Sequence, residues 1–159
     1  MPKVTGLGHV GLFVNDLQPM VDFYENFLGM TVTDRGADDW IVFLSARPEA
    51  EHHELALVKA PDRKSDPQQI SFTVASLADL KAFWEGIKRR GYTVNRVLNH
   101  GNAFGCYFQD PEGNNVEVYW HTGRDCPQPH GDPLNLDLSE AELLALVEHL
   151  PAKAPAAAR

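Results

Sequence analysis

The stretch HVGLFVNDLQPMVDFYENFLGMTV, residues 9–32, is the first copy of a repeat, because the chain returns to it as QISFTVASLADLKAFWEGIKRRGYTV at residues 69–94. When His9 is laid over Gln69, apolar and aromatic positions coincide through both copies, with two extra residues in the second. Self-similarity at a period of about sixty residues is the mark of a repeated supersecondary unit. The sequence therefore predicts a chain made of two similar modules.

Each copy contains the same order of expected elements. Alternating β-branched and aromatic residues predict a first strand. Apolar residues at helical spacing then predict a helix, and three short strands follow. The elements expected in the first copy are 6–14, 17–28, 30–34, 39–45 and 52–59, and those in the second are 69–75, 77–90, 92–97, 103–109 and 114–120. Asp16 and Ser76 occupy the N-cap positions of the helices, and Gly29 and Gly91 the positions where they end.

These elements define an α+β fold of two βαβββ modules, at about residues 4–60 and 67–121. We expect their strands to form a cupped mixed β-sheet within a single domain, residues 1–125. One face of such a sheet packs on the helices, and the other is available for a binding site.

Residues 126–159 are expected to form an extension with a helix and a flexible tail. The segment DLSEAELLALVEHL carries a capping box at Ser139 and Glu142, followed by an apolar stripe at helical spacing. The tail AKAPAAAR is low in complexity. The helix is a candidate for contact with a second subunit, and a homodimer is the expected assembly.

Composition excludes several classes of protein. The formal net charge of −8 on 159 residues argues against nucleic acid or an anionic membrane as the main partner. No apolar run approaches the length of about 18 residues that a transmembrane helix needs, and the N-terminus lacks the apolar region of a signal peptide. Cys106 and Cys126 lack the spacing of a disulfide framework or a metal site. We therefore expect a cytoplasmic protein in a reducing compartment.

Four polar residues lie at related places in the two copies. His9 and Gln69 lie on the first strands, and Glu54 in HHELALV and Glu117 in NNVEVYW, which we expect to correspond, lie on the last strands. Each is surrounded by apolar neighbours, and burying such groups without partners is costly. A divalent cation (iron, manganese, zinc or nickel) would satisfy several of them at once. The alternative is a polar pocket satisfied by water and by mutual hydrogen bonds.

The repeat and the segments GHVGLFVNDL, FYENFLGM and YFQDPEGNNVEVYW resemble the vicinal oxygen chelate superfamily. This superfamily includes glyoxalase I, extradiol dioxygenases, epimerases and antibiotic-resistance proteins. The resemblance covers about residues 4–125 and is most specific in DPEGNNVEVYW. Within the superfamily, the chain is most similar to the type I extradiol dioxygenases, which cleave catecholic rings with dioxygen.

That resemblance implies a metal site. GHV resembles the strand that carries the first histidine ligand of these enzymes, which corresponds to His9, and NVEVYW resembles the strand of the glutamate ligand, which corresponds to Glu117. Gln69 stands where the second histidine ligand falls. A set of two histidines and one carboxylate leaves open positions on Fe(II) for a catecholate and dioxygen.

The same resemblance implies three catalytic residues. HHELAL resembles the strand with the histidine that moves protons during oxygen activation, which corresponds to His53. NHGNAFGCYFQDPEGN resembles the segment with a substrate-side histidine and tyrosine, which correspond to His100 and Tyr107. The implied substrate is a small aromatic molecule.

Gln69 leaves alternatives open. An amide oxygen is neutral and a weaker ligand than imidazole, so the site would hold iron loosely, prefer manganese, zinc or nickel, or bind a small molecule without catalysis. A ligand set that includes Glu54 would instead suit a glyoxalase- or epimerase-like isomerase. His53 and Glu54 are neighbours in an expected strand and would point to opposite faces. We favour His53, because His100 and Tyr107 belong to the same resemblance.

Three aromatic residues are candidates for the wall of an apolar pocket beside this site. They are Trp40, Phe104 and Trp120.

Overall fold

The computed structural model describes residues 8–63, 65–127 and 130–150 of the chain. It divides into two compact units. The first contains residues 1–67 together with 110–114, and the second contains residues 68–109 together with 115–159.

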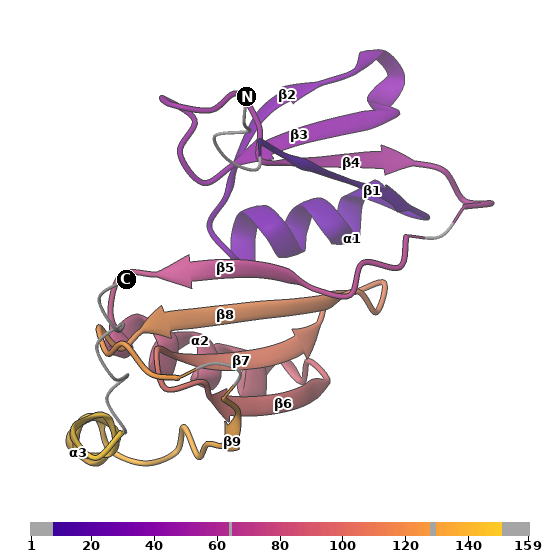
Figure 1. The fold of residues 1–159 in the computed structure, drawn as a ribbon. Coiled ribbons are helices and arrows are strands. Elements are labelled where there is room, and N and C mark those ends of the chain that lie inside the picture. The colour runs from indigo at the N-terminus through magenta and orange to yellow at the C-terminus, as the bar shows by residue number, and fades with distance from the viewer. Residues whose placement is uncertain (1–7, 64, 128–129, 151–159) are drawn as a thin grey trace. The chain divides into compact units, whose positions relative to one another are not determined.

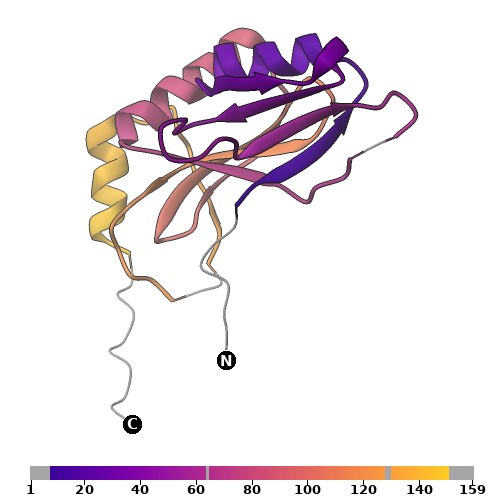
Figure 2. The ribbon, with the colours of Figure 1, turned by 90° about the horizontal axis from the view of Figure 1, so that it is seen from above.

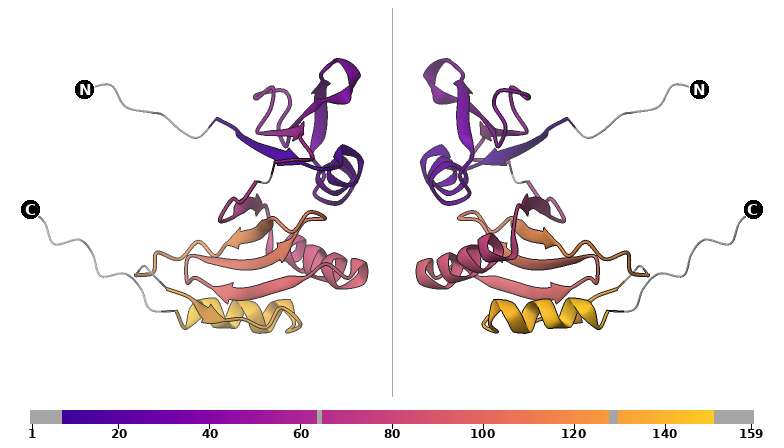
Figure 3. Two further views of the ribbon diagram at one scale, coloured as in Figure 1. Left: turned by 90° about the vertical axis from the view of Figure 1, so that its right-hand side faces the viewer. Right: turned by 90° about the vertical axis from the view of Figure 1, so that its left-hand side faces the viewer.

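The first unit is a four-stranded sheet with a helix on one face (Figures 1 and 3). Its elements are β1 (Val10–Val14), α1 (Leu17–Val21), η1 (Asp22–Phe27), β2 (Thr31–Arg35), η2 (Ala37–Asp39), β3 (Ile41–Ser45) and β4 (Leu55–Lys59). The strand order is β1-β4-β3-β2, with β1 parallel to β4 and the other pairs antiparallel. Leu12 and Val14 of β1 are buried with Met20 of the helix, and so are Leu55, Ala56 and Leu57 of β4. Burial therefore alternates in β1, as in a half-buried strand, whereas β4 is buried on both faces over these three residues.

The helix expected at residues 17–28 changes its hydrogen bonding midway. Asp16 caps α1 as predicted, with its carboxylate accepting from the N–H of Gln18 at 3.1 Å. From Asp22 the turns widen to the π type, and the Leu28 N–H donates to the Phe23 carbonyl at 3.0 Å. Gly29 then ends the helix at φ +79°, a left-handed conformation that glycine adopts at little cost.

The second unit repeats the order of elements (Figures 1 and 2). They are β5 (Ile70–Val74), α2 (Leu77–Arg90), β6 (Val94–Asn99), β7 (Ala103–Gln109), β8 (Asn115–His121), β9 (Asp132–Pro133) and α3 (Glu140–Glu148). The strand order is β5-β8-β7-β6-β9, with β5 parallel to β8. Ser76 caps α2, and Gly91 ends it at φ +70°. The α+β class and the two βαβββ modules are therefore confirmed, while the joining of their sheets into one cup stays a prediction.

The C-terminal segment has one strand more than the sequence predicted. Residues 132–133 form β9, which pairs with Leu98 and Asn99 of β6. The chain before α3 is held on α2, because the Trp84 Nε1–H donates to Asp137 Oδ1 at 2.8 Å. Figure 2 shows α3 beside α2. The predicted capping box of Ser139 and Glu142 is present, while the predicted tail at 151–159 lies outside the described residues.

The turn at residues 110–114 joins β7 to β8 but belongs to the first unit. The hydroxyl of fully buried Tyr24 donates to Asp110 Oδ2 at 3.1 Å, and the Asn114 side chain donates to the same oxygen at 2.7 Å. Burial raises the pKa of Asp110, against these hydrogen bonds, which lower it. The DPEGNN turn is therefore built around one buried and fully partnered carboxyl group.

Within the ranges that the structure describes, no helix combines the length and the apolarity needed to cross a bilayer.

Candidate functional site

The first unit brings His9 and His53 together. His9 directly precedes β1, and His53 lies just before β4. These two strands are parallel and in register from Val10 and Leu55, so their leading ends lie side by side. The ring centroids of His9 and His53 are 4.3 Å apart, and the Phe43 ring lies 4.7 Å from that of His53.

The surroundings of His53 favour its neutral form. Partial burial lowers its pKa, and the nearby rings of His9 and His52 lower it further, while Glu51 acts in the opposite direction. The Nδ1 atoms of His52 and His53 are 2.9 Å apart, so one ring donates a hydrogen bond to the other. A neutral imidazole has an acceptor nitrogen, which is the form that a general base requires.

Glu54 points away from this histidine pair. Its carboxylate accepts from the Ala46 N–H at 2.9 Å and from Arg47 Nε at 3.0 Å. Partial burial tends to raise the pKa of Glu54, but these bonds and the charge of Arg47 bring it below the usual value. The two neighbours diverge as expected, although not through strand alternation, because β4 begins only at Leu55. His53, rather than Glu54, lies beside His9.

The second unit gathers the other candidates around Glu117. The register places Ser71 of β5 opposite Glu117 of β8, and Tyr107 of β7 opposite it on the other side. Glu117 is buried at 6 % exposure, and its Oε2 accepts from Ser71 Oγ at 2.6 Å and from Gln69 Nε2 at 3.3 Å. At Gly105 a Cβ atom would lie 2.5 Å from Glu117 Oε1, so only glycine leaves room for this carboxylate.

Tyr107 links its strand to His100. Its hydroxyl lies 2.9 Å from His100 Nε2, and Tyr107 itself pairs with Glu117 across β7 and β8. His100 Nδ1 lies 2.8 Å from the carbonyl oxygen of His130, and because a carbonyl only accepts, Nδ1 carries a proton. A neutral His100 thus accepts from the Tyr107 hydroxyl at Nε2, whereas a doubly protonated His100 donates to it there.

Arg96 and Ser71 belong to this cluster and were not predicted. The Arg96 guanidinium lies 4.2 Å from the centre of the Tyr107 ring, a cation–π contact. Burial, followed by the hydrogen bond to Glu117, raises the pKa of Tyr107 well above its usual value, while Arg96 acts in the opposite direction. Ser71 was foreseeable, because it lies two residues after Gln69 and therefore on the same face of its strand.

The register corrects one pairing of the repeat. With His9 laid over Gln69, Leu55 of β4 corresponds to Val116 of β8, because these residues pair with Val10 and Ile70. The equivalent of Glu117 is consequently Ala56, so the predicted pairing of Glu54 with Glu117 is wrong. The first unit has no carboxylate at the place that Glu117 occupies in the second.

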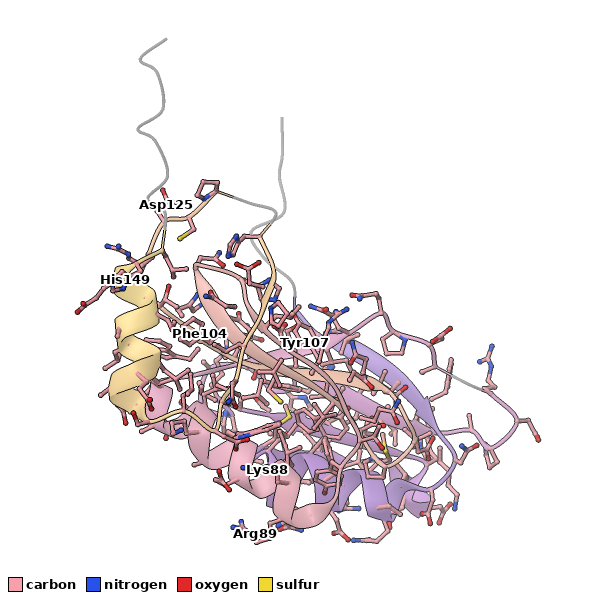
Figure 4. All side chains as sticks on the ribbon, turned by 90° about the horizontal axis from the view of Figure 1, so that it is seen from below. Lys88, Arg89, Phe104, Tyr107, Asp125 and His149 are labelled. Carbon is pink, nitrogen blue, oxygen red and sulfur yellow. The ribbon has the colours of Figure 1, made fainter. Side chains whose placement is uncertain are left out.

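The predicted aromatic wall is not on the face that carries Glu117. Phe104 pairs with Trp120 across β7 and β8, three residues from the pair of Tyr107 with Glu117, so the two pairs face opposite sides of the sheet. Figure 4 labels Tyr107 and Phe104 on this strand. Trp40, in the first unit, is 54 % exposed between η2 and β3.

Two mixed sheets, each built in the βαβββ order, define the class of fold to which this chain belongs. The profile of the Glyoxalase/Bleomycin resistance protein/Dioxygenase superfamily matches residues 6–118, and the chain belongs to this family. A crystal structure of a glyoxalase/dioxygenase from Nostoc punctiforme has a similar fold, with a TM-score of 0.60 at 19 % identity over 74 % of this chain and 91 % of that one.

Several relatives are named as ring-cleaving dioxygenases. Metapyrocatechase 2 of Cupriavidus necator is 34 % identical over 70 % of this chain and 35 % of its own length. A manganese-dependent 2,3-dihydroxybiphenyl 1,2-dioxygenase of Geobacillus genomosp. 3 is 26 % identical over 74 % of this chain and 37 % of its own length. The chain thus spans little more than a third of these two dioxygenases. Glutathione transferase FosA of Serratia marcescens is 30 % identical over 73 % of this chain and 81 % of its own.

The donor types present fit a divalent metal. His9 offers an imidazole, Glu117 a buried carboxylate over the space left by Gly105, and Gln69 an amide. In residues 8–63, 65–127 and 130–150, no three histidine, cysteine, aspartate or glutamate side chains are gathered as metal ligands. The candidate set contains only two side chains of these types, one in each unit, and its third donor is an amide. An oxygen-rich set of this kind suits harder ions such as manganese better than a set with a second imidazole.

Proposed function

We propose that this chain is a metal-dependent extradiol-type dioxygenase that cleaves a catecholic or related aromatic substrate with dioxygen. In this proposal, His9, Gln69 and Glu117 hold the metal, Fe(II) or Mn(II). The observation that carries it is the hydrogen bond between His100 and Tyr107, with Tyr107 opposite Glu117 on the neighbouring strand. Relatives named as dioxygenases of catechol-type substrates support the same reading.

The bound metal would supply an electrophilic centre for the substrate oxygens and for dioxygen. His53 would accept a proton from a substrate hydroxyl, a role that its place beside His9 supports. Both atoms of dioxygen enter the product as a ring carbon–carbon bond next to the hydroxylated carbons breaks.

Tyr107 and His100 would orient the substrate and move a proton. Tyr107 and His100 share one hydrogen bond, so the pair can donate the phenolic proton to an oxygen of the reacting molecule and recover it from His100. Arg96, stacked on the Tyr107 ring, restrains that ring in this role.

The proposal extends to the setting of the protein. The substrate is a small molecule, the protein acts in the cytoplasm, and the assembly is a homodimer with α3 as a candidate contact. The free thiols of Cys106 and Cys126, both buried, agree with a reducing compartment.

Oxygen consumption tests this function. The protein is loaded anaerobically with Fe(II) or Mn(II) and mixed with catechol or biphenyl-2,3-diol, while a coloured ring-cleavage product is followed by absorbance. His53→Ala should abolish product formation, whereas His52→Ala should reduce it far less. An absence of oxygen uptake with every loaded metal and catechol would refute the proposal.

A second candidate is a FosA-like transfer of a thiol to a small electrophile. It is favoured by one observation, since the match with FosA covers 81 % of that protein, far more than the matches with the two dioxygenases. Consumption of fosfomycin and glutathione, without oxygen uptake, would select this function over ring cleavage.

A further inference from the structure

Ser71 of β5 and Gln69, directly before that strand, hold one oxygen of Glu117. Ser71 Oγ lies 2.6 Å from Oε2, Gln69 Nε2 lies 3.3 Å from the same oxygen, and Gln69 Nε2 lies 2.9 Å from Ser71 Oγ. A carboxylate only accepts and a hydroxyl has one proton, so Ser71 donates to Glu117 and accepts from Gln69. The NH₂ end of the Gln69 amide therefore faces the carboxylate.

These contacts satisfy a group whose burial would otherwise be expensive. Glu117 is 6 % exposed, and a carboxylate withdrawn from water without donors destabilises the folded state strongly. Oε2 accepts from Ser71 and Gln69, and Oε1 lies next to Gly105. The strand register that places Ser71 opposite Glu117 sets this arrangement, so it needs no metal to form.

From this geometry we infer that Ser71, together with Gln69, is a carboxylate clamp that holds Glu117 in place in the metal-free protein and competes with a metal ion for Oε2. The competition rests on the proposed role of Glu117 as a ligand, whereas the hold on the metal-free carboxylate does not. Ser71 is thus a positioning residue. Metal uptake through the Gln69 oxygen requires the amide to turn, because its nitrogen end now faces Glu117.

Thermal unfolding in the presence of a chelator tests the hold. Ser71→Thr keeps the hydroxyl. Ser71→Val has the same shape as the threonine variant but carries a methyl group in place of the hydroxyl. The valine variant should unfold about 3 °C below the threonine variant, since it leaves a buried acceptor without its closest donor. Thr73→Val, on the same face of the same strand, is the matched control and should not lower Tm. Equal Tm values for the two Ser71 variants would overturn the clamp.

Titration with Mn²⁺, in which free Mn²⁺ is measured by electron paramagnetic resonance, tests the competition. Ser71→Val should bind Mn²⁺ about fivefold more tightly than Ser71→Thr, because the metal no longer displaces a hydrogen bond. Equal or weaker binding by the valine variant would overturn the competition. If the unmodified protein does not bind Mn²⁺, the proposed metal site fails and the competition fails with it, while the thermal comparison still decides whether Ser71 holds Glu117.

Discussion

The hydroxyl of Tyr107 has one proton and lies 2.9 Å from His100 Nε2, and Glu117 is opposite Tyr107 on the neighbouring strand. We expect Tyr107→Phe to lower the turnover of the metal-loaded protein about 100-fold, because a positioned proton donor contributes on this order. Steady-state oxygen uptake measures the loss. Tyr119→Phe is the control. It removes a hydroxyl from the face of β8 that carries Glu117, and it should retain activity. A fully active Tyr107→Phe would remove this tyrosine from the mechanism.

Tyr24 supports the structure through the hydrogen bond that its hydroxyl donates to Asp110. Its buried hydroxyl donates to Asp110, and its loss leaves a buried carboxyl group short of one donor. Tyr24→Phe should lower the free energy of unfolding by about 1–3 kcal/mol, measured by urea denaturation. A variant as stable as the parent would show that other donors already satisfy Asp110.

At the residue scale, the sequence indicated the polar candidates but not their partners. Tyr107 and Glu117 were identified through a resemblance, and the structure places them opposite each other on adjacent strands. Ser71 and Arg96 were missed because neither stands out by type, and each gains its role from the residue that the sheet sets beside it.

The connection between β3 and β4 is stabilised by the charge of Glu54. Its pKa in the folded state lies below the usual value of 4.5, so its contribution is fully present above that pH and is lost as the pH falls through the lowered pKa. Glu54→Gln should remove about 0.5–1 kcal/mol at neutral pH and flatten the decline in stability between about pH 5 and 3.

Glu51→Gln, in the same connection, is the control for that acid titration. It should leave the pH dependence of urea unfolding close to that of the parent protein. If Glu54→Gln keeps the full acid dependence, the ion pair with Arg47 contributes nothing to stability.

At the scale of the elements, the hydrophobic pattern predicted the order and type of the helices and strands, but it did not predict where each one begins and ends. Helical spacing predicted 17–28, and the switch to π-type turns at Asp22 carries no signal in that spacing. Strand β4 was expected from residue 52 and begins at Leu55, because the Glu54 side chain bonds back to the preceding turn. β9 was missed because two residues are too short for an alternating pattern.

For the whole molecule, metal binding would raise the stability of the fold. A cation that binds only the folded state stabilises it by about 2.7 kcal/mol at 100 times its dissociation constant. Mn²⁺ at that level should raise the urea midpoint of the parent protein, and neither His9→Ala nor Glu117→Gln should respond. His121→Ala is the control and should respond as the parent does. A response that survives both ligand variants would place the metal elsewhere.

The repeat allowed the architecture of each module to be predicted, because local pattern and strand order suffice for it. The equivalence of single residues across the repeat could not be fixed in the same way. A shift of two residues in laying β4 over β8 is invisible when both strands are largely apolar, and it keeps every side chain on the same face while it matches Glu117 with Ala56 instead of Glu54. The backbone pairing of Leu55 with Val10 determines the correct alignment, which the sequence alone does not.

The short strand β9 has a consequence for solubility. The outer edge of a sheet is a template on which a strand of another molecule can pair. β9 lies along the β6 edge, where the Leu134 N–H points inward to the Val97 carbonyl and the preceding residue, Pro133, faces outward without an N–H to offer. An incoming strand would find no N–H donor at Pro133. Pro133 and Leu134 therefore protect this edge of the second sheet against pairing with a strand of another molecule.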